Sequence, residues 1–215
     1  MSPPEVVVID YGVGNLLSVQ RALEHCGAAV VCTAEPDRIL ASKRVVLPGV
    51  GAFANGMHAL QRLGLVAVIR ELAKRKTPLL GICLGMQLLL EESEEFGVTT
   101  GLGLIPGRVI SVPEFAVPGA KQKIPHIGWN GLVPAHAGAT WRHPCLQDIC
   151  PGDAAYFVHS FMAAPTVPEH RVSDVLYGGH KIAAVIASDR ITGCQFHPEK
   201  SGEVGLKLLR RFVAE

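Results

Sequence analysis

Residues suited to acyl-transfer chemistry stand in two short segments, 81–85 (Gly-Ile-Cys-Leu-Gly) and 195–199 (Gln-Phe-His-Pro-Glu). A cysteine thiolate is a strong nucleophile, a histidine can hold and return its proton near neutral pH, and a carboxylate can orient the imidazole. Cys83, His197 and Glu199 therefore form a candidate catalytic triad in which Cys83 is the nucleophile.

Cys83 stands between a predicted strand, 78–82, and a predicted helix that starts at Leu84. Glycines two positions before and after the cysteine suit the tight turn called a nucleophile elbow, which exposes the side chain at the carboxyl end of the strand. The helix start favours a thiolate, and the backbone N–H of Leu84 is expected to point toward a developing oxyanion. A buried structural cysteine is the alternative interpretation.

A proline separates His197 from Glu199, and its fixed backbone path lets the carboxylate fold back onto the second ring nitrogen of the histidine. Taken alone, this segment could equally be a surface turn with a local His–Glu pair. The two segments together are a stronger signal than either one, because a nucleophile needs an acid/base partner.

The first half of the chain, up to about residue 92, alternates apolar runs with helical patterns. We expect strands at 5–9, 28–32, 44–47 and 78–82, and helices from near residue 15 to 26, at 53–63, at 65–75 and from 84 to about 92. This alternation predicts an α/β fold, with a central, mostly parallel sheet flanked by helices.

The second half is rich in glycine, proline and short β-branched runs. We expect strands at 108–112, 154–159, 172–177 and 181–187, a hairpin turn at Gly178-Gly179, and a closing amphipathic helix at 206–212. These strands predict a smaller antiparallel flank of the same unit. We see no repeat and no long linker, so we expect a single domain over residues 1–215.

Composition excludes several classes of protein. Of the 215 residues, 48% are hydrophobic and 18% charged, which is the reverse of a disordered chain, and the net charge of +1 favours neither nucleic acid nor an anionic membrane. The most apolar stretch, 79–90, is far shorter than the roughly 20 residues that cross a bilayer. The sequence has no signal-peptide pattern and no Cys-x-x-Cys motif, so we expect a reduced, cytoplasmic protein. The spacing of metal ligands is also missing, so we expect no metal. We expect no cofactor.

Three motifs resemble those of class I glutamine amidotransferases, whose triad is Cys-His-Glu. They are 81–87 (Gly-Ile-Cys-Leu-Gly-Met-Gln), 196–199 (Phe-His-Pro-Glu) and 48–51 (Pro-Gly-Val-Gly). The resemblance implies the class I glutamine amidotransferase (flavodoxin-like) fold. It also implies hydrolysis of glutamine to glutamate and ammonia through a cysteinyl thioester.

The same resemblance implies further roles around the triad. Gly49, Val50 and Gly51 would supply a second oxyanion donor beside Leu84, although a plain turn is the alternative. Gln87, one helical turn beyond the nucleophile, could bind the substrate, or it could be a helix-capping or solvent-facing amide.

The glutamine pocket would also be lined by Ser160 and Phe161, according to the resemblance. Phe161 stands where a tyrosine would also suit the family. A hydroxyl contact to the substrate is therefore expected to be absent.

Four further segments are similar to the glutaminase subunits of imidazole glycerol phosphate synthases: 10–18, 125–130, 156–161 and Lys200-Ser201. This similarity implies a separate partner, the cyclase subunit, a (β/α)8 barrel that receives ammonia in histidine biosynthesis. It would form imidazole glycerol phosphate and an aminoimidazole carboxamide ribonucleotide. The implied interface or gating residues are Lys200, Tyr11, Asn15, Trp129 and Asn130. Lys200 could instead be merely solvated, and Trp129 could belong to the core.

Two other functions remain open. One is the glutaminase of another synthase, namely anthranilate, aminodeoxychorismate or guanylate synthase, although Lys200 and segment 126–130 speak against it. The other is a non-catalytic flavodoxin-like module in which Cys83 is a redox sensor.

Segment 135–151 is long and irregular, and we expect its His136, His143, Cys145 and Cys150 to be solvent-facing rather than a metal site.

Overall fold

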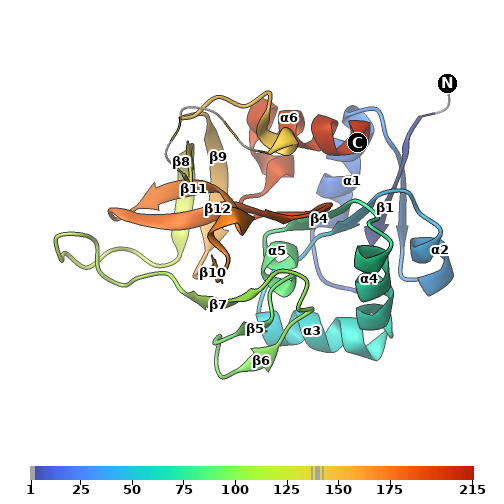
Figure 1. The fold of residues 1–215 in the computed structure, drawn as a ribbon, viewed down its shortest axis with the longest axis horizontal. Coiled ribbons are helices and arrows are strands. Elements are labelled where there is room, and N and C mark those ends of the chain that lie inside the picture. Colours follow the sequence, from blue (N-terminus) through green and yellow to red (C-terminus); the bar gives the residue numbers. More distant parts are fainter. Residues whose placement is uncertain (1–2, 137, 139–140, 142) are drawn as a thin grey trace.

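Two β-sheets and their flanking helices make up the protein (Figure 1). A computed structural model describes residues 3–136, 138, 141 and 143–215. The strands are β1 (Glu5–Ile9), β2 (Ala29–Thr33), β3 (Val45–Leu47), β4 (Leu79–Ile82), β5 (Glu92–Ser93), β6 (Thr99–Thr100), β7 (Gly107–Ser111), β8 (His126–Pro134), β9 (Ala154–His159), β10 (Phe161–Pro165), β11 (Arg171–Tyr177), β12 (His180–Ser188) and β13 (Ile191–Cys194). The helices are α1 (Leu16–His25), α2 (Pro36–Leu40), α3 (Phe53–Arg62), α4 (Leu65–Lys74), α5 (Leu84–Leu88) and α6 (Gly202–Ala214), with 3-10 turns η1 (Pro144–Leu146), η2 (Pro168–His170) and η3 (Pro198–Lys200).

The large sheet has the strand order β2-β1-β3-β4-β13-β12-β11-β8-β9. Pairing is parallel from β2 through β1, β3 and β4 to β13. It is antiparallel from β13 through β12, β11 and β8 to β9. The expected antiparallel flank therefore continues the central sheet. The second sheet is smaller and has the strand order β10-β7-β5-β6.

Both faces of the parallel strands are covered, which explains their unbroken apolar sequences. In β1, Val6 and Val8 belong to one hydrophobic cluster, and Val7 and Ile9 to the other. Figure 1 shows α1 and α6 on one side of this sheet and α3, α4 and α5 on the other. Each of the longer helices turns an apolar face inward at helical spacing, as with the buried residues of α6.

The hairpin between β11 and β12 forms as the Gly-Gly pair predicts. Tyr177 pairs with His180, and Gly178 and Gly179 have φ angles of 57° and 81°. Positive φ at both central residues is the requirement of a type I′ turn, which suits the twist of the two strands.

Two expectations about helices need correction. The helix expected from 84 to about 92 ends at Leu88, and the N–H groups of Leu89 and Leu90 bond carbonyls three residues back instead of four. The N–H groups of Leu102 and Leu104 bond the carbonyls of Leu88 and Leu89, which draws the next segment across this end of α5. The short helix α2 was not expected, since five residues carry too little periodicity.

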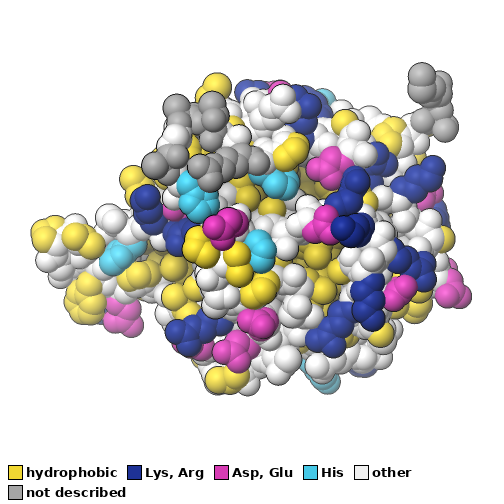
Figure 2. Space-filling view, viewed as in Figure 1, with side chains coloured by type: hydrophobic (Ala, Val, Ile, Leu, Met, Phe, Trp, Pro, Cys, Tyr) yellow, Lys and Arg dark blue, Asp and Glu magenta, His cyan; other side chains and the backbone are white. Residues whose placement is uncertain are grey.

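Surface charge is mixed, in line with the net charge of +1. Figure 2 shows Lys and Arg side chains interspersed with Asp and Glu on the face in view. In the part of the chain that the structure describes, no helix is long and apolar enough to cross a membrane.

Candidate active site

The candidate catalytic residues meet because two parallel strands end side by side. In β4 and β13, Ile82 pairs with Cys194, and the N–H of Cys83 bonds the carbonyl of Cys194 at 2.8 Å. Cys83 follows β4 directly, and His197 lies three residues after the end of β13. Both side chains therefore lie at the carboxyl edge of the sheet, where open α/β sheets bind ligands.

The turn at Cys83 is a strained strand-to-helix junction. Cys83 has φ 53° and ψ −109°, in a region that residues other than glycine rarely adopt. A Cβ on Gly85 would lie 1.8 Å from the carbonyl oxygen of Leu47, and one on Gly81 would lie 2.7 Å from the oxygen of Gly85. The two glycines are therefore required by close backbone approach, as the elbow pattern predicts.

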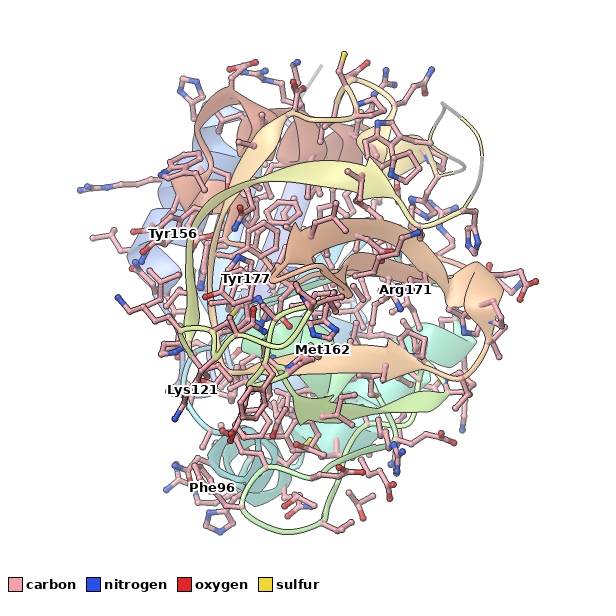
Figure 3. The ribbon with its side chains drawn as sticks, turned by 90° about the vertical axis from the view of Figure 1, so that its left-hand side faces the viewer. Phe96, Lys121, Tyr156, Met162, Arg171 and Tyr177 are labelled. Atoms are coloured by element: carbon pink, nitrogen blue, oxygen red, sulfur yellow. The ribbon has the colours of Figure 1, made fainter. Side chains whose placement is uncertain are left out.

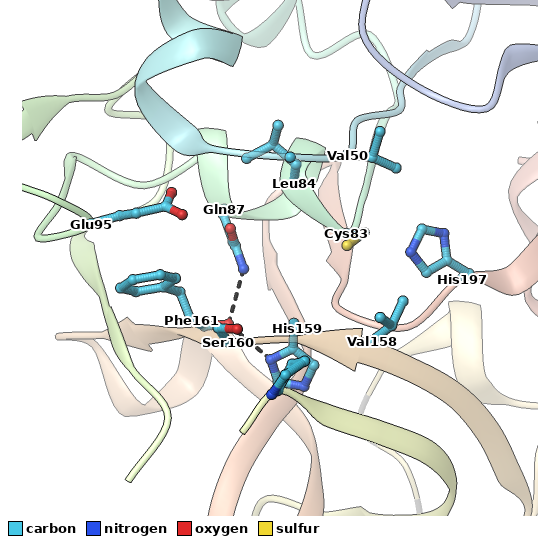
Figure 4. Close-up of a pocket in the computed structure, with 12 residues that line it drawn as sticks. Val50, Cys83, Leu84, Gln87, Glu95, Val158, His159, Ser160, Phe161 and His197 are labelled. Carbon is cyan, nitrogen blue, oxygen red and sulfur yellow. Dashed lines mark hydrogen bonds between the residues drawn. The ribbon is translucent and has the colours of Figure 1, made fainter. Parts of the chain in front are cut away.

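His197 is held by Glu199 and faces Cys83. Its Nδ1 lies 2.8 Å from Oε1 of Glu199, and their side chains are only 4% and 1% exposed. Because the carboxylate can only accept, Nδ1 carries a proton and Nε2 is the nitrogen left for Cys83. Burial works against a charge on the imidazole, but hydrogen bonds to Cys83 and Glu199 raise the pKa of His197 to about 10. The imidazole can therefore hold a proton beside the sulfur (Figure 4).

Ser201 fixes the backbone that carries His197. Its hydroxyl donates to the carbonyl of His197 at 2.7 Å and accepts from the N–H of Tyr156 at 2.9 Å. The N–H of His197 in turn bonds the carbonyl of Tyr156 at 3.1 Å. These hydrogen bonds hold the backbone of His197 against β9.

A cavity of about 310 Å³ lies over these residues (Figure 4). This volume is within the range that small-molecule sites in proteins usually have. Its lining residues are Val50, Gly51, Cys83, Leu84, Gln87, Glu95, Pro125, Val158, His159, Ser160, Phe161 and His197. The structure therefore brings together the candidate nucleophile Cys83, His197, part of the glycine loop and the pocket residues expected from the sequence.

Gly49 is a buried member of the glycine loop and does not line the cavity. A Cβ on Gly49 would be 2.5 Å from the hydroxyl of Tyr11, which donates to the carbonyl of Pro48 at 2.7 Å. Tyr11 is 1% exposed and belongs to the core on the α3 side of the sheet. The expectation that Tyr11 lies on a partner-contacting surface is therefore wrong. Its side chain is buried and holds the glycine loop through the hydrogen bond to Pro48.

Gln87 is buried and holds the pocket wall. Its Nε2 donates to the carbonyl of Phe161 and to Oε1 of Gln195, both at 3.0 Å. The alternative of a solvent-facing amide is wrong, because the residue is 6% exposed. With both amide hydrogens used inside the protein, Gln87 can offer only its carbonyl oxygen to a ligand.

Glu95 is a pocket residue that sequence reasoning missed. It lies in the loop between β5 and β6 and lines the cavity, and its Oε2 accepts from the N–H of Phe53 at 2.6 Å. The same loop carries Phe96, which is labelled in Figure 3 and is 92% exposed. Its ring meets that of Phe161 edge-on, with ring centroids 6.1 Å apart. No motif signals Glu95, because only the fold brings its loop to the pocket.

Three of the other residues expected at a partner surface are accessible, and the fourth is half-buried. Lys200 and Asn15 are exposed, Asn130 is half-buried, and Trp129 is 56% exposed, so the core alternative for Trp129 is wrong. The indole of Trp129 lies 5.9 Å from the ring of Tyr156 on the neighbouring strand.

No described residue of segment 135–151 lines the cavity, and residues 137, 139, 140 and 142 are outside the described part of the chain. Nδ1 of His143 lies 2.9 Å from Sγ of Cys145, which is buried, so the expectation that both face solvent is wrong for Cys145. Among the described residues, no group of three or more His, Cys, Asp or Glu could hold a metal ion.

A family model and similar curated proteins indicate the same kind of protein. The family model for "Glutamine amidotransferase class-I" matches residues 7–215. "Imidazole glycerol phosphate synthase subunit HisH 1" of Legionella pneumophila (strain Lens) is 51% identical over 97% of this chain and 98% of its own. "Imidazole glycerol phosphate synthase subunit HisH" of Geobacillus sp. (strain WCH70) is 42% identical over 96% of this chain and 95% of its own.

Solved structures share the fold. "Crystal structure of glutamine amidotransferase" superposes with a TM-score of 0.72 at 14% identity and covers 97% of this chain and 99% of its own. "Structure of PurLQS from Thermotoga maritima" gives a TM-score of 0.71 at 19% identity, covering 99% of this chain and 98% of the other. At these identities the likeness concerns the α/β architecture alone.

Proposed function

Because the chain belongs to the class-I glutamine amidotransferase family, we propose that it is the glutaminase subunit of an imidazole glycerol phosphate synthase. The relatives from Legionella and Geobacillus, similar over nearly the whole chain, carry that subunit's name. The observation that carries the chemistry is the meeting of Cys83 with the buried His197–Glu199 pair at one cavity. A redox module would not need this pair.

The first half of the reaction forms a thioester. The thiolate of Cys83 attacks the side-chain amide carbon of glutamine, and the carbonyl electron pair moves to oxygen. Backbone N–H groups of Leu84 and of the loop at Val50 and Gly51 stabilise this oxyanion; such donors contribute about 3 kcal/mol each in related reactions. As the carbon–nitrogen bond breaks, the Nε2 proton of His197 passes to the nitrogen, and ammonia leaves.

The second half restores the enzyme. His197, now neutral, takes a proton from water, and the resulting hydroxide attacks the thioester carbon. The same donors hold the second oxyanion until the carbon–sulfur bond breaks. Glutamate leaves, and the thiolate of Cys83 again faces a protonated His197. Glu199 keeps the useful ring nitrogen toward the sulfur in both halves.

Binding of glutamine follows from the polar groups at the cavity. Glu95 places a carboxylate there, which suits the α-ammonium group of an amino acid. Gln87 can accept a hydrogen bond through its carbonyl oxygen, and Ser160 and Phe161 line the same cavity. Phe161 supplies no hydroxyl, so the substrate depends more on the other contacts.

The proposed function requires a partner that uses the ammonia released from glutamine. Free ammonia becomes ammonium in water and loses its nucleophilic lone pair, so it must pass to a second active site. We assign that site to the cyclase subunit, a (β/α)8 barrel acting in the cytoplasm. Its contact surface would include Lys200, Asn15, Trp129 and Asn130, of which all but the half-buried Asn130 are exposed.

Glutamine hydrolysis, followed with and without the cyclase subunit and its nucleotide substrate, tests this function. We expect low activity from the chain alone and strong stimulation by the complete synthase. Equal stimulation by a chorismate-using or guanylate-forming synthase subunit would overturn the specific assignment while leaving the glutaminase chemistry intact.

A further inference from the structure

Two buried glutamines connect the cavity wall with the nucleophile. Gln195, which is 0% exposed, directs its Nε2 at Sγ of Cys83 across 3.7 Å, within hydrogen-bond range for sulfur. Its Oε1 accepts from Nε2 of Gln87 at 3.0 Å, and the same Nε2 donates to the carbonyl of Phe161 at 3.0 Å. The mechanism above uses neither amide at the sulfur.

The direction of both amides is fixed by chemistry. The carbonyl of Phe161 can only accept, so Gln87 must present its NH₂ group to it. The second hydrogen of that NH₂ points at Gln195, which must therefore present its oxygen. The NH₂ of Gln195 then faces Cys83, and a reversed amide would place a carbonyl oxygen against the thiolate.

Two histidines extend this chain from Phe161 outward. Nδ1 of His159 lies 2.8 Å from the carbonyl of Phe161, and its Nε2 lies 2.9 Å from Nδ1 of His126. Nε2 of His126 is bonded by Nδ2 of Asn130 (2.6 Å). Burial lowers the pKa of both histidines to about 4, so each is neutral at pH 7 and has one donor and one acceptor nitrogen.

The tautomers of these histidines follow from the same acceptor. His159 must donate to Phe161 through Nδ1, so its Nε2 accepts and His126 must donate through Nδ1. Nε2 of His126 then accepts from the amide of Asn130, which neighbours the exposed Trp129. Each of the three hydrogen bonds from Asn130 through His126 and His159 to Phe161 therefore has one allowed direction.

We propose that Gln195 is a further catalytic residue that stabilises the thiolate of Cys83 by donating a hydrogen bond to its sulfur. Gln87 is a positioning residue that fixes the direction of the Gln195 amide, and the chain from Asn130 holds the shared carbonyl in place. This inference rests on the proposed role of Cys83 as the nucleophile.

The test measures how readily Cys83 reacts with iodoacetamide between pH 5 and 10, followed by mass spectrometry of the peptide that contains it. Alkylation proceeds through the thiolate, so the rate reports the thiolate fraction without glutamine or a partner. Gln195→Met keeps the length of the side chain but removes the donor. We expect the midpoint of its pH profile to lie about one pH unit higher, so that alkylation on the acid side of the wild-type midpoint is about tenfold slower.

The matched control is Gln61→Leu, which changes an exposed glutamine of α3 and should alkylate like the wild type. Gln87→Met should also slow the reaction, but should add no further slowing in the Gln195→Met background, because both act through one donor. A folded Gln195→Met protein with wild-type rate and midpoint would overturn the proposal. Fully additive effects would refute the role given to Gln87.

If Gln195→Met does not fold, two measurements still decide the matter. Gln195→Asn retains the amide but shortens the side chain by one methylene, which moves the amide away from the sulfur. This variant should also be alkylated more slowly than the wild type. In the wild type, the NMR signal of the Gln195 NH₂ should shift as Cys83 titrates, and an unresponsive signal would refute the hydrogen bond. Failure of these tests leaves cyclase-dependent glutaminase activity untouched, so the two proposals fail separately.

Discussion

Ile82 pairs with Cys194 across the parallel strands β4 and β13. Cys83 follows Ile82, and the segment with His197 follows Cys194. The pairing therefore places both at the same edge of the sheet, although they are far apart in the sequence. β13 is also where the sheet changes from parallel to antiparallel pairing, because it pairs antiparallel with β12. The meeting of Cys83 with the His197 segment is therefore a property of the strand order, and a slip in this register would separate them.

Cys83→Ala tests the nucleophile directly. The variant lacks the sulfur that would form the thioester in the proposed mechanism, so glutamine-dependent turnover should fall by at least about 10³-fold. Complex formation with the cyclase subunit should persist, because the residue is 7% exposed and contributes little surface. Cys150→Ala, at an exposed cysteine, is the control and should retain activity. Normal glutamate release by Cys83→Ala would mean that another group is the nucleophile.

Gly85→Ala tests the geometry of the elbow. Its Cβ would lie 1.8 Å from a backbone oxygen of Leu47, so the turn or β3 must move. We expect the free energy of unfolding to fall by about 3 kcal/mol and activity to be lost with it. Gly56→Ala is the control, since its nearest neighbours are flexible leucine ends at 3.2 Å or more. Urea unfolding of both variants measures the difference, and equal stabilities would contradict the steric argument.

Local patterns predicted most of the parallel half of the fold. The run of apolar residues at 5–9 became β1 with the expected bounds, and Gly64 separates α3 from α4 as expected. The glycine-to-glycine spacing around Cys83 predicted the elbow because its constraints are local. β8 was missed, since its glycines and alternating exposure give no continuous apolar signal.

The polar network of the site could not be predicted, because its partners come from different strands. Gln87 meets Gln195 only after β4 and β13 pair, and Glu95 reaches the cavity only through the β5–β6 loop. The prediction that Tyr11 lies on the surface failed for a related reason. The sequence motif does not show burial, which here depends on the loop at Pro48 that accepts a hydrogen bond from the Tyr11 hydroxyl. That residues 1–215 form one domain stays a prediction.

The buried pair of His126 and His159 should make the protein sensitive to acid. Burial lowers the pKa of both to about 4, whereas an unfolded histidine titrates near 6.5. Between these values the unfolded state binds more protons, so stability should fall as pH drops from about 6.5 toward 4. Each histidine contributes a slope on the order of 1 kcal/mol per pH unit.

His126→Gln removes one of these proton acceptors. Its unfolding free energy, measured in urea at a series of pH values, should decline less steeply than that of the wild type in the same window. His58→Gln, at an exposed histidine, should follow the wild-type slope. Identical slopes for all three proteins would show that His126 is not neutral and buried in the folded state.

Glu95→Gln tests substrate recognition apart from catalysis. The amide keeps an oxygen for the N–H of Phe53 but removes the negative charge that would face the α-ammonium group of glutamine. A charge-assisted hydrogen bond contributes about 1.5–3 kcal/mol, so KM should rise by roughly 10- to 100-fold with a smaller change in kcat. Glu94→Gln is the control, because Glu94 pairs with Arg108 on an exposed surface. A fall in kcat at constant KM would instead place Glu95 in the chemical step.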